Sequence, residues 1–284
     1  MIALPGKPVK KARSMLETNP WGRRIIILIV VVYISVLILG PIIALSVGAF
    51  QEGLRAIQVA LSHPDVLSAF LLTTLIGLFV VAVHAILGAV VAWVFVRDRF
   101  PGRNLINGLI DMPFAVSPVV VGYMLLLLFG RNGIFGPLLA PLGIRVAFAI
   151  PGMVLATLFV TLPFMIRELI PVLENLGISQ EQAAATLGAS GWQIFRRVTF
   201  PALRWGFIYG VTLTFARALG EFGAVLVIGG GVQGRTETAT LYIYRALDER
   251  NYVGAYSAAL ILGVFSLLLV LGTDYIRRRE QERK

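Results

Sequence analysis

The sequence predicts an all-α integral membrane protein with six transmembrane helices. Of its 284 residues, 57% are apolar and only 14% are charged. Several charge-poor runs exceed the roughly 20 residues that an α-helix needs to cross a bilayer. Lysine and arginine also collect in alternate connections between these runs, as they do in multi-pass proteins. Together, these observations favour a membrane bundle over a soluble fold.

Six runs are predicted to span the membrane, in the order 25–50, 66–96, 104–130, 146–166, 205–231 and 252–273. The first run is longer than the 7–15 apolar residues of a signal peptide, so we expect it to be retained. The third run contains Pro113 and Pro118, and the fifth ends in glycines. Neighbouring helices can satisfy backbone groups that Pro and Gly leave free, so we expect kinks there and not breaks.

The distribution of positive charge predicts the topology. If the amino terminus is cytoplasmic, eighteen Lys and Arg residues face the cytoplasm, six face the opposite side, and Arg217 lies within the fifth span. Both termini are then cytoplasmic, with basic tails at 1–24 and 277–284 around a six-helix domain at 25–276. The net charge of +10 is therefore explained by topology, and nucleic-acid binding is not expected.

A polar segment at 179–201, between the fourth and fifth spans, is the strongest local signal. Ser179 with Gln182 fits a capping box, as does Ser190 with Gln193, and Gly188 is a typical residue to follow a helix. These signals predict two short helices that meet at a bend, with Pro201 ending the second. By the charge count this hairpin lies in the cytoplasm, where a soluble partner can reach it.

The hairpin has two interpretations. It could be an interfacial helix whose aromatic residues, Trp192, Phe195 and Phe200, dip into lipid. However, Ala183–Ala185 and Gly188 form a small-residue surface that contributes little to membrane burial and allows another protein's helices to approach closely. Docking of a cytosolic partner is therefore the favoured interpretation.

Four ionisable residues are predicted within the spans. Arg217 and Glu221 are four residues apart, so they can pair on one helix face, either as a structural pair or with a role in a translocation path. Asp111 is expected to lie near the inner interface and to pair with Arg99 or Arg103. His84 stands among apolar residues and is expected to be a hydrogen-bonded packing residue.

Several chemistries lack the residues that they need. The sequence has no cysteine and two histidines, so no metal site is expected. It has no phosphate-binding Gly-x-x-x-x-Gly-Lys-Ser/Thr loop and neither of the hydrolase motifs Gly-x-Ser-x-Gly and His-Glu-x-x-His. We therefore expect no catalytic residue and no bound cofactor, and any ATP and Mg²⁺ that drive transport belong to a partner.

The hairpin resembles the cytoplasmic coupling loop of ABC-importer permeases. That pattern runs Glu-Ala-Ala, three residues, Gly, nine residues and Ile-x-Leu-Pro, and it is met here by Gln182, Ala183, Ala184, Gly188, Val198, Phe200 and Pro201. Gln replaces the Glu of the pattern, Val the Ile and Phe the Leu. Glu181 could supply the missing charge one position early.

Further segments resemble the sulfate and molybdate branch of these permeases: 216–225, 117–122 and 128–130. The segments 111–118 and 159–171 resemble the W-type of the two paralogous permease subunits of the sulfate/thiosulfate importer. The similarity runs from about residue 25 to the carboxyl terminus.

The resemblance implies a type I importer permease fold with a core at about 66–272, in a bacterial inner membrane. It also implies a paralogous permease subunit, two ATPase subunits, and a periplasmic or extracellular sulfate-binding protein. A molybdate or tungstate permease, which usually works as two copies of one chain, is the nearest alternative. A self-sufficient secondary transporter would need charged coupling sites and no docking hairpin, and a non-transporting scaffold would leave the Gly- and Pro-rich spans unexplained.

Overall fold

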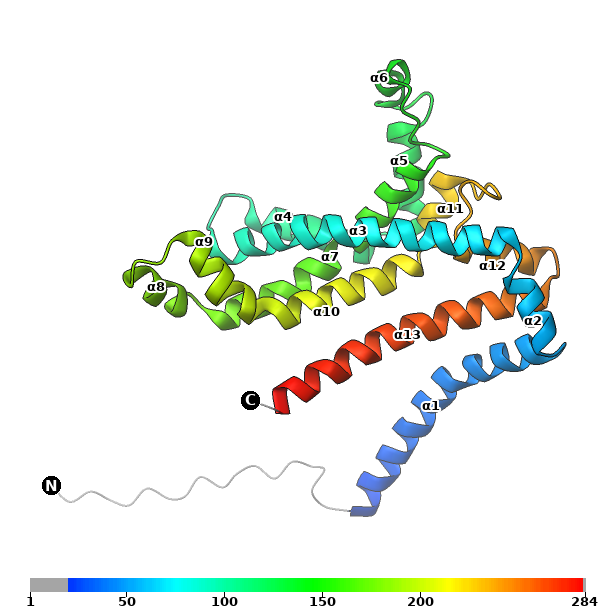
Figure 1. Ribbon diagram of the computed structural model, residues 1–284, viewed down its shortest axis with the longest axis horizontal. Helices are drawn as coiled ribbons and strands as arrows, with labels where there is room; N and C mark the ends of the chain where they lie inside the picture. Colours follow the sequence, from blue (N-terminus) through cyan, green and yellow to red (C-terminus); the bar gives the residue numbers. More distant parts are fainter. Residues whose placement is uncertain (1–19, 283–284) are drawn as a thin grey trace. The chain divides into compact units, whose positions relative to one another are not determined.

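The computed structural model describes residues 20–282, and all of the regular elements among these residues are helices (Figure 1). The longest are α1 (Pro20–Phe50), α3 (Pro64–Arg97), α7 (Ile150–Leu176), α10 (Phe200–Leu219) and α13 (Tyr252–Glu282). The others are α2 (Leu54–Leu61), α4 (Arg103–Ala115), α5 (Pro118–Phe129), α6 (Gly136–Leu139), the 3₁₀ turn η2 (Ala140–Leu142), α8 (Ser179–Thr186), α9 (Gly191–Ile194), the π-helix η3 (Phe195–Thr199), α11 (Gly223–Gly229) and α12 (Ala239–Asp248).

The chain divides into two compact units between Val47 and Gly48. The first unit contains most of α1, whose apolar side chains from Ile25 to Val47 are largely exposed. Such a surface suits contact with lipid, because a helix that is apolar on all sides is stable in a hydrocarbon environment. The second unit contains all the elements that follow α1.

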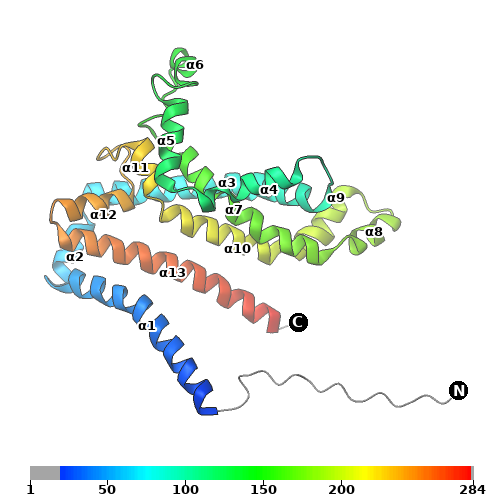
Figure 2. The same ribbon diagram turned by 180° about the vertical axis from the view of Figure 1, so that it is seen from behind.

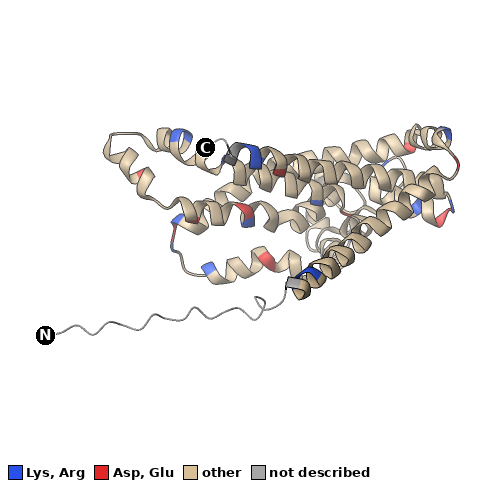
Figure 3. Cartoon of the chain, turned by 90° about the horizontal axis from the view of Figure 1, so that it is seen from below, with Lys and Arg blue, Asp and Glu red and all other residues tan. Residues whose placement is uncertain are grey.

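The described helices contain four single candidates for membrane spans, namely α1, α3, α7 and α13. Two bent pairs, α4 with α5 and the helix from Gly191 to Leu219 with α11, also pass the test of length and hydropathy. The count reaches the six spans predicted from the sequence if each bent pair is one span. Figure 3 shows that most of the length of the long helices carries neither acidic nor basic residues.

The core of the second unit forms where α3, α7 and α10 lie side by side (Figures 1 and 2). Its largest apolar cluster joins these helices to α4 and includes Met165, Ile166 and Leu169. Close approach depends on small residues, since Gly88 and Gly210 both face Met165. This is how membrane helices commonly pack, because association in lipid relies on close van der Waals contact.

The third span is broken, and the expectation of a kink was wrong. The axes of α4 and α5 differ by 113°. Pro118 disfavours the helical conformation at the residue before it, and Ser117 accordingly has ψ 135°. Val116 is also extended, at ψ 132°. Pro113, by contrast, is accommodated inside α4.

The fifth span is also broken, between α10 and α11, with a bend of 56°. Gly220, Glu221 and Phe222 form the connection. The Glu221 carboxylate accepts a hydrogen bond from the Ala224 N–H in the first turn of α11. The Thr240 hydroxyl donates to the Glu221 carbonyl oxygen, so the backbone of the break is partly satisfied by side chains.

The predicted tails fall only partly within the described residues. Residues 1–19 and 283–284 lie outside them, whereas 20–24 begin α1 and 277–282 end α13. The fourth span is longer than predicted, because α7 continues ten residues beyond 166 and includes Pro171. This extension carries the chain to the hairpin at 179–201.

Candidate functional site

The hairpin consists of α8, a tight turn, α9 and η3. The second predicted capping box is confirmed, because the Gln193 N–H donates to the Ser190 hydroxyl and the Ser190 N–H donates to the Gln193 side chain. The first is wrong: Ile178 is the N-cap of α8, and Ser179 is already helical. Gly177, with φ at 62°, turns the chain immediately before this helix.

Gly188 ends α8 as predicted, in the left-handed conformation at φ 84°. The Gly188 N–H donates to the Ala185 carbonyl and the Ala189 N–H donates to the Ala184 carbonyl. These two bonds form a Schellman motif, which satisfies carbonyls that the end of the helix leaves free.

Pro201 does not end the second helix of the hairpin, contrary to the prediction. It lies in the first turn of α10, where a missing N–H costs little. The π-helix η3 joins α9 to α10, so the helix runs from Gly191 into the fifth span. The second half of the hairpin is therefore continuous with α10.

A charged contact ties the hairpin to the end of α3. The Glu181 carboxylate accepts hydrogen bonds from Arg97 Nη2 at 3.0 Å and from the Thr199 hydroxyl at 2.8 Å. Both charged side chains are largely buried. The Arg97 guanidinium also stacks over the Trp93 ring. The charge that Glu181 could supply to the coupling pattern is thus engaged in an ion pair with Arg97 in this structure.

The remaining predicted docking residues are distributed over two helices. Most of them are exposed: Gln182, Ala183 and Gly188 on α8 and its turn, and Phe200 and Pro201 at the start of α10. Two are half-buried, namely Ala184 in α8 and Val198 in η3. The most exposed apolar side chain is Leu187, at 89%, and Trp192 follows within the hairpin at 68%. Sequence reasoning missed Leu187, although its position directly before the turn glycine signals a protruding residue.

Arg217 and Glu221 form the predicted ion pair, at 2.9 Å. Glu221 lies just beyond the end of α10 and not within the helix, yet the spacing of four still brings the two side chains together. The Glu221 side chain is 2% exposed, whereas that of Arg217 is 29% exposed. Arg217 lines a cavity of about 450 Å³ at the break in the third span.

Asp111 does not pair with Arg99 or Arg103. Both of its carboxylate oxygens accept hydrogen bonds from Arg167 of α7, which also donates to the Asn107 side chain. The α4 helix runs beside α7, so Asp111 meets an arginine that is distant in sequence. His84 is the packing residue that was predicted, with Nε2 at 3.1 Å from the Leu158 carbonyl and 3.0 Å from the Thr161 hydroxyl.

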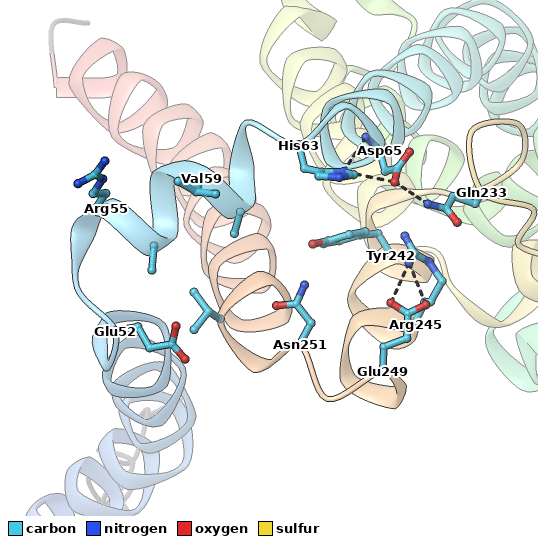
Figure 4. A pocket seen from close by; sticks show the side chains of 13 residues that line it. Glu52, Arg55, Val59, His63, Asp65, Gln233, Tyr242, Arg245, Glu249 and Asn251 are labelled. Carbon is cyan, nitrogen blue, oxygen red and sulfur yellow. Dashed lines mark hydrogen bonds and ion pairs between the residues drawn. The ribbon is translucent and has the colours of Figure 1, made fainter.

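A second cavity, of about 800 Å³, lies between α2, α12 and the start of α3 (Figure 4). Its walls combine apolar residues with a polar network, in which Gln233 donates to Asp65, and Arg245 donates to Glu237 and Glu249. The bonds with Glu237 raise the pKa of Arg245, and burial raises the pKa of the Tyr242 phenol. The wall therefore carries the Arg245 guanidinium in ion pairs with Glu237 and Glu249, and beside it the uncharged Tyr242 phenol.

Comparisons with known proteins agree with this architecture. Residues 84–282 match the family described as the binding-protein-dependent transport system inner membrane component. The chain is 45% identical to the sulfate transport system permease protein CysW of Escherichia coli K12 over 248 residues, which cover 87% of this chain and 85% of that protein. It is 36% identical to CysT of the same organism, covering 87% of this chain and 89% of that protein.

Among solved structures, a chain of a bacterial alginate ABC transporter, crystallised in complex with an alginate-bound periplasmic protein, has the same fold. The TM-score is 0.72 at 18% identity, over 91% of this chain and 94% of that chain. The protein therefore belongs to the family of inner membrane components of binding-protein-dependent transport systems.

Proposed function

We propose that this chain is a permease subunit of an ATP-binding-cassette importer that moves sulfate, and also thiosulfate, into the cytoplasm. The observation that carries the proposal is the 45% identity, over most of both chains, to a protein named as a sulfate permease. The hairpin at 179–201 supports the ATP-driven part, because it presents exposed small and apolar residues at one end of the bundle.

The hairpin docks on an ATPase subunit. Leu187 and Trp192 provide apolar contacts, while Gln182, Ala183 and Gly188 let the partner's helices approach closely. ATP and Mg²⁺ bind to two such ATPase subunits, and this chain does not hydrolyse ATP. When ATP draws the two ATPases together, the hairpin moves with the groove that holds it, and its continuous helix into α10 converts this movement into reorientation of the spans.

The opposite end of the bundle receives the loaded binding protein. By the charge count both termini and the hairpin are cytoplasmic, so the cavity in Figure 4 lies on the external side. A hydrogen bond from Gln233, in the segment before α12, to Asp65 at the start of α3 joins these two parts of the wall, so a partner that binds there can act on both. The permease is then a two-state element biased by nucleotide at one end and by the binding protein at the other.

The direct test is uptake of labelled sulfate by vesicles that contain this chain, a paralogous permease, the ATPase and a sulfate-binding protein. We expect uptake that requires ATP and that thiosulfate inhibits, because both are tetrahedral dianions of similar size. Molybdate is larger and should compete less well. Preferential uptake of molybdate would contradict the assignment and favour a molybdate permease, and uptake without ATP would favour a secondary transporter.

A further inference from the structure

We propose that the cavity at the break in the third span is a transient binding subsite for the transported oxyanion, and that Arg217 is the residue that contacts it. This inference rests on the proposed function, because it names the site at which sulfate passes through this subunit. Its evidence comes from the shape of the cavity, the exposure of Arg217 and the position of the two broken spans.

The cavity is formed mainly by the break itself. Residues 113–118 provide one wall, and the others come from Val160 and Phe164 of α7 and from Arg217 of α10. A volume of about 450 Å³ is within the range of small-ligand pockets, roughly 300–1,000 Å³. Non-helical backbone at membrane depth is tolerated where it is buried in protein or lines a water-filled cavity. The extended residues Val116 and Ser117 satisfy this condition because they line the cavity.

The two charged side chains of the ion pair differ in their exposure. Glu221 is held away from solvent, where its carboxylate meets Arg217 and the Ala224 N–H. Arg217 lines the cavity. Within residues 20–282, Glu221 is the only acidic residue that forms an ion pair with Arg217. A guanidinium has five N–H donors, so one carboxylate leaves donors for an anion. The cavity therefore has a positive wall although the pair is neutral.

Both breaks lie near the middle of their predicted spans, 104–130 and 205–231. They are held together by close packing of α5 against α11, because Gly223 faces Val119 and Gly122 faces Val227. Ser117, also on the cavity wall, caps α5 without a side-chain hydrogen bond to the helix, so its hydroxyl adds a donor. A dianion that meets a single arginine already paired with a carboxylate is bound weakly, which suits a path that must release its substrate.

The first experiment separates a structural pair from an anion contact. We compare wild type with the double variant Arg217→Gln and Glu221→Gln, and with Arg217→Lys, in the complete importer with saturating binding protein. The double variant should assemble normally and hydrolyse ATP, but its maximal sulfate uptake should fall roughly tenfold or more, as expected for the loss of a charge-assisted hydrogen bond. Arg217→Lys should retain part of the uptake, because it keeps the charge.

The matched control is Asp274→Asn with Arg278→Gln, an exposed pair with the same spacing on α13. Its uptake per assembled complex should equal that of wild type. If the double variant at Arg217 and Glu221 also transports at the wild-type rate, the pair is structural and the inference is overturned. Failure of the wild-type complex to take up sulfate would instead contradict the proposed function.

The second experiment tests the cavity without requiring transport. The chain has no cysteine, so Ser117→Cys introduces a unique thiol, which can be labelled in membranes with a negatively or a positively charged thiosulfonate reagent. We expect faster labelling by the negative reagent, protection by excess sulfate, and loss of the charge preference when Arg217 and Glu221 are both replaced by Gln. A thiol that does not react, or that reacts at the same rate with both reagents, would contradict an anion site.

Discussion

Glu221 connects two elements through one carboxylate. It neutralises Arg217 at the end of α10, and it accepts the Ala224 N–H at the start of α11. A carboxylate at the first turn of a helix is stabilised by the free N–H groups and by the helix dipole. The position of the fifth-span break is therefore determined by a side chain as well as by the glycines around it.

Glu221→Gln alone should reduce accumulation of the protein in the membrane more than the double variant with Arg217→Gln. Glutamine keeps an acceptor for the Ala224 N–H, so the single change isolates the charge. An unpaired arginine near the centre of a membrane helix costs about 2.5–3.5 kcal/mol on insertion scales. Quantitative immunoblots of membranes measure this difference. Equal accumulation of the two variants would show that the protein tolerates Arg217 in the membrane without the charge of Glu221.

At the scale of elements, the hairpin is held by the contacts of Glu181 with Arg97 and Thr199. With Glu181→Gln, the side-chain amide oxygen should still accept the hydrogen bond from the Thr199 hydroxyl, but the bond from Arg97 should be weaker because the negative charge is lost. The contact is largely buried and charged, so we expect a loss of roughly 1–3 kcal/mol of local stability. Hydrogen exchange of the amides in 179–199 should then be faster.

The control for this change is Thr186→Val, which removes a local hydroxyl bond to the Ala183 carbonyl on the exposed side of α8. It should change the exchange only in the last turn of α8. If Glu181→Gln gives the same limited effect, the Arg97 contact does not hold the hairpin.

Gly188→Arg should leave the protein inserted but prevent the ATPase from co-purifying. The added side chain meets open space within this chain, so a partner's surface is what it would disturb. The left-handed conformation adds strain, and Gly143→Arg reproduces that strain, because Gly143 has φ at 70° and also faces open space. Normal co-purification and uptake with Gly188→Arg would contradict docking at this turn.

The sequence predicted the helical class, the approximate spans and the capping at Gly188 and Ser190, because these depend on local periodicity and backbone preference. It did not predict the break at Ser117, although the preference of a residue before proline for extended backbone favours it. It also placed Asp111 beside the wrong arginine, and it did not predict the contact between Glu181 and Arg97. Those contacts depend on helix pairing across more than 50 residues, which local patterns do not specify.

At the scale of the whole molecule, two sequence identities support a prediction for the composition of the proposed importer. The chain is 45% identical to the CysW protein of E. coli and 36% identical to its CysT protein, so it is more similar to one of these two permease proteins than to the other. In a transporter with two different permeases, each permease needs a surface that is complementary to the other permease. In a homodimer, each subunit needs a self-complementary patch. We therefore expect a heteromeric importer with one copy of this chain.

Co-expression of two copies of this chain that carry different affinity tags, together with the paralogous permease, the ATPase and the binding protein, tests this composition. Purification through one tag should recover the paralogue and the ATPase, but the second tag should be absent, because the only position for this chain in each complex is already filled. Omission of the paralogue should abolish both assembly and ATP-dependent sulfate uptake. Recovery of both tags in one active complex would contradict the heteromeric arrangement and would place the protein with permeases that work as two copies of a single chain.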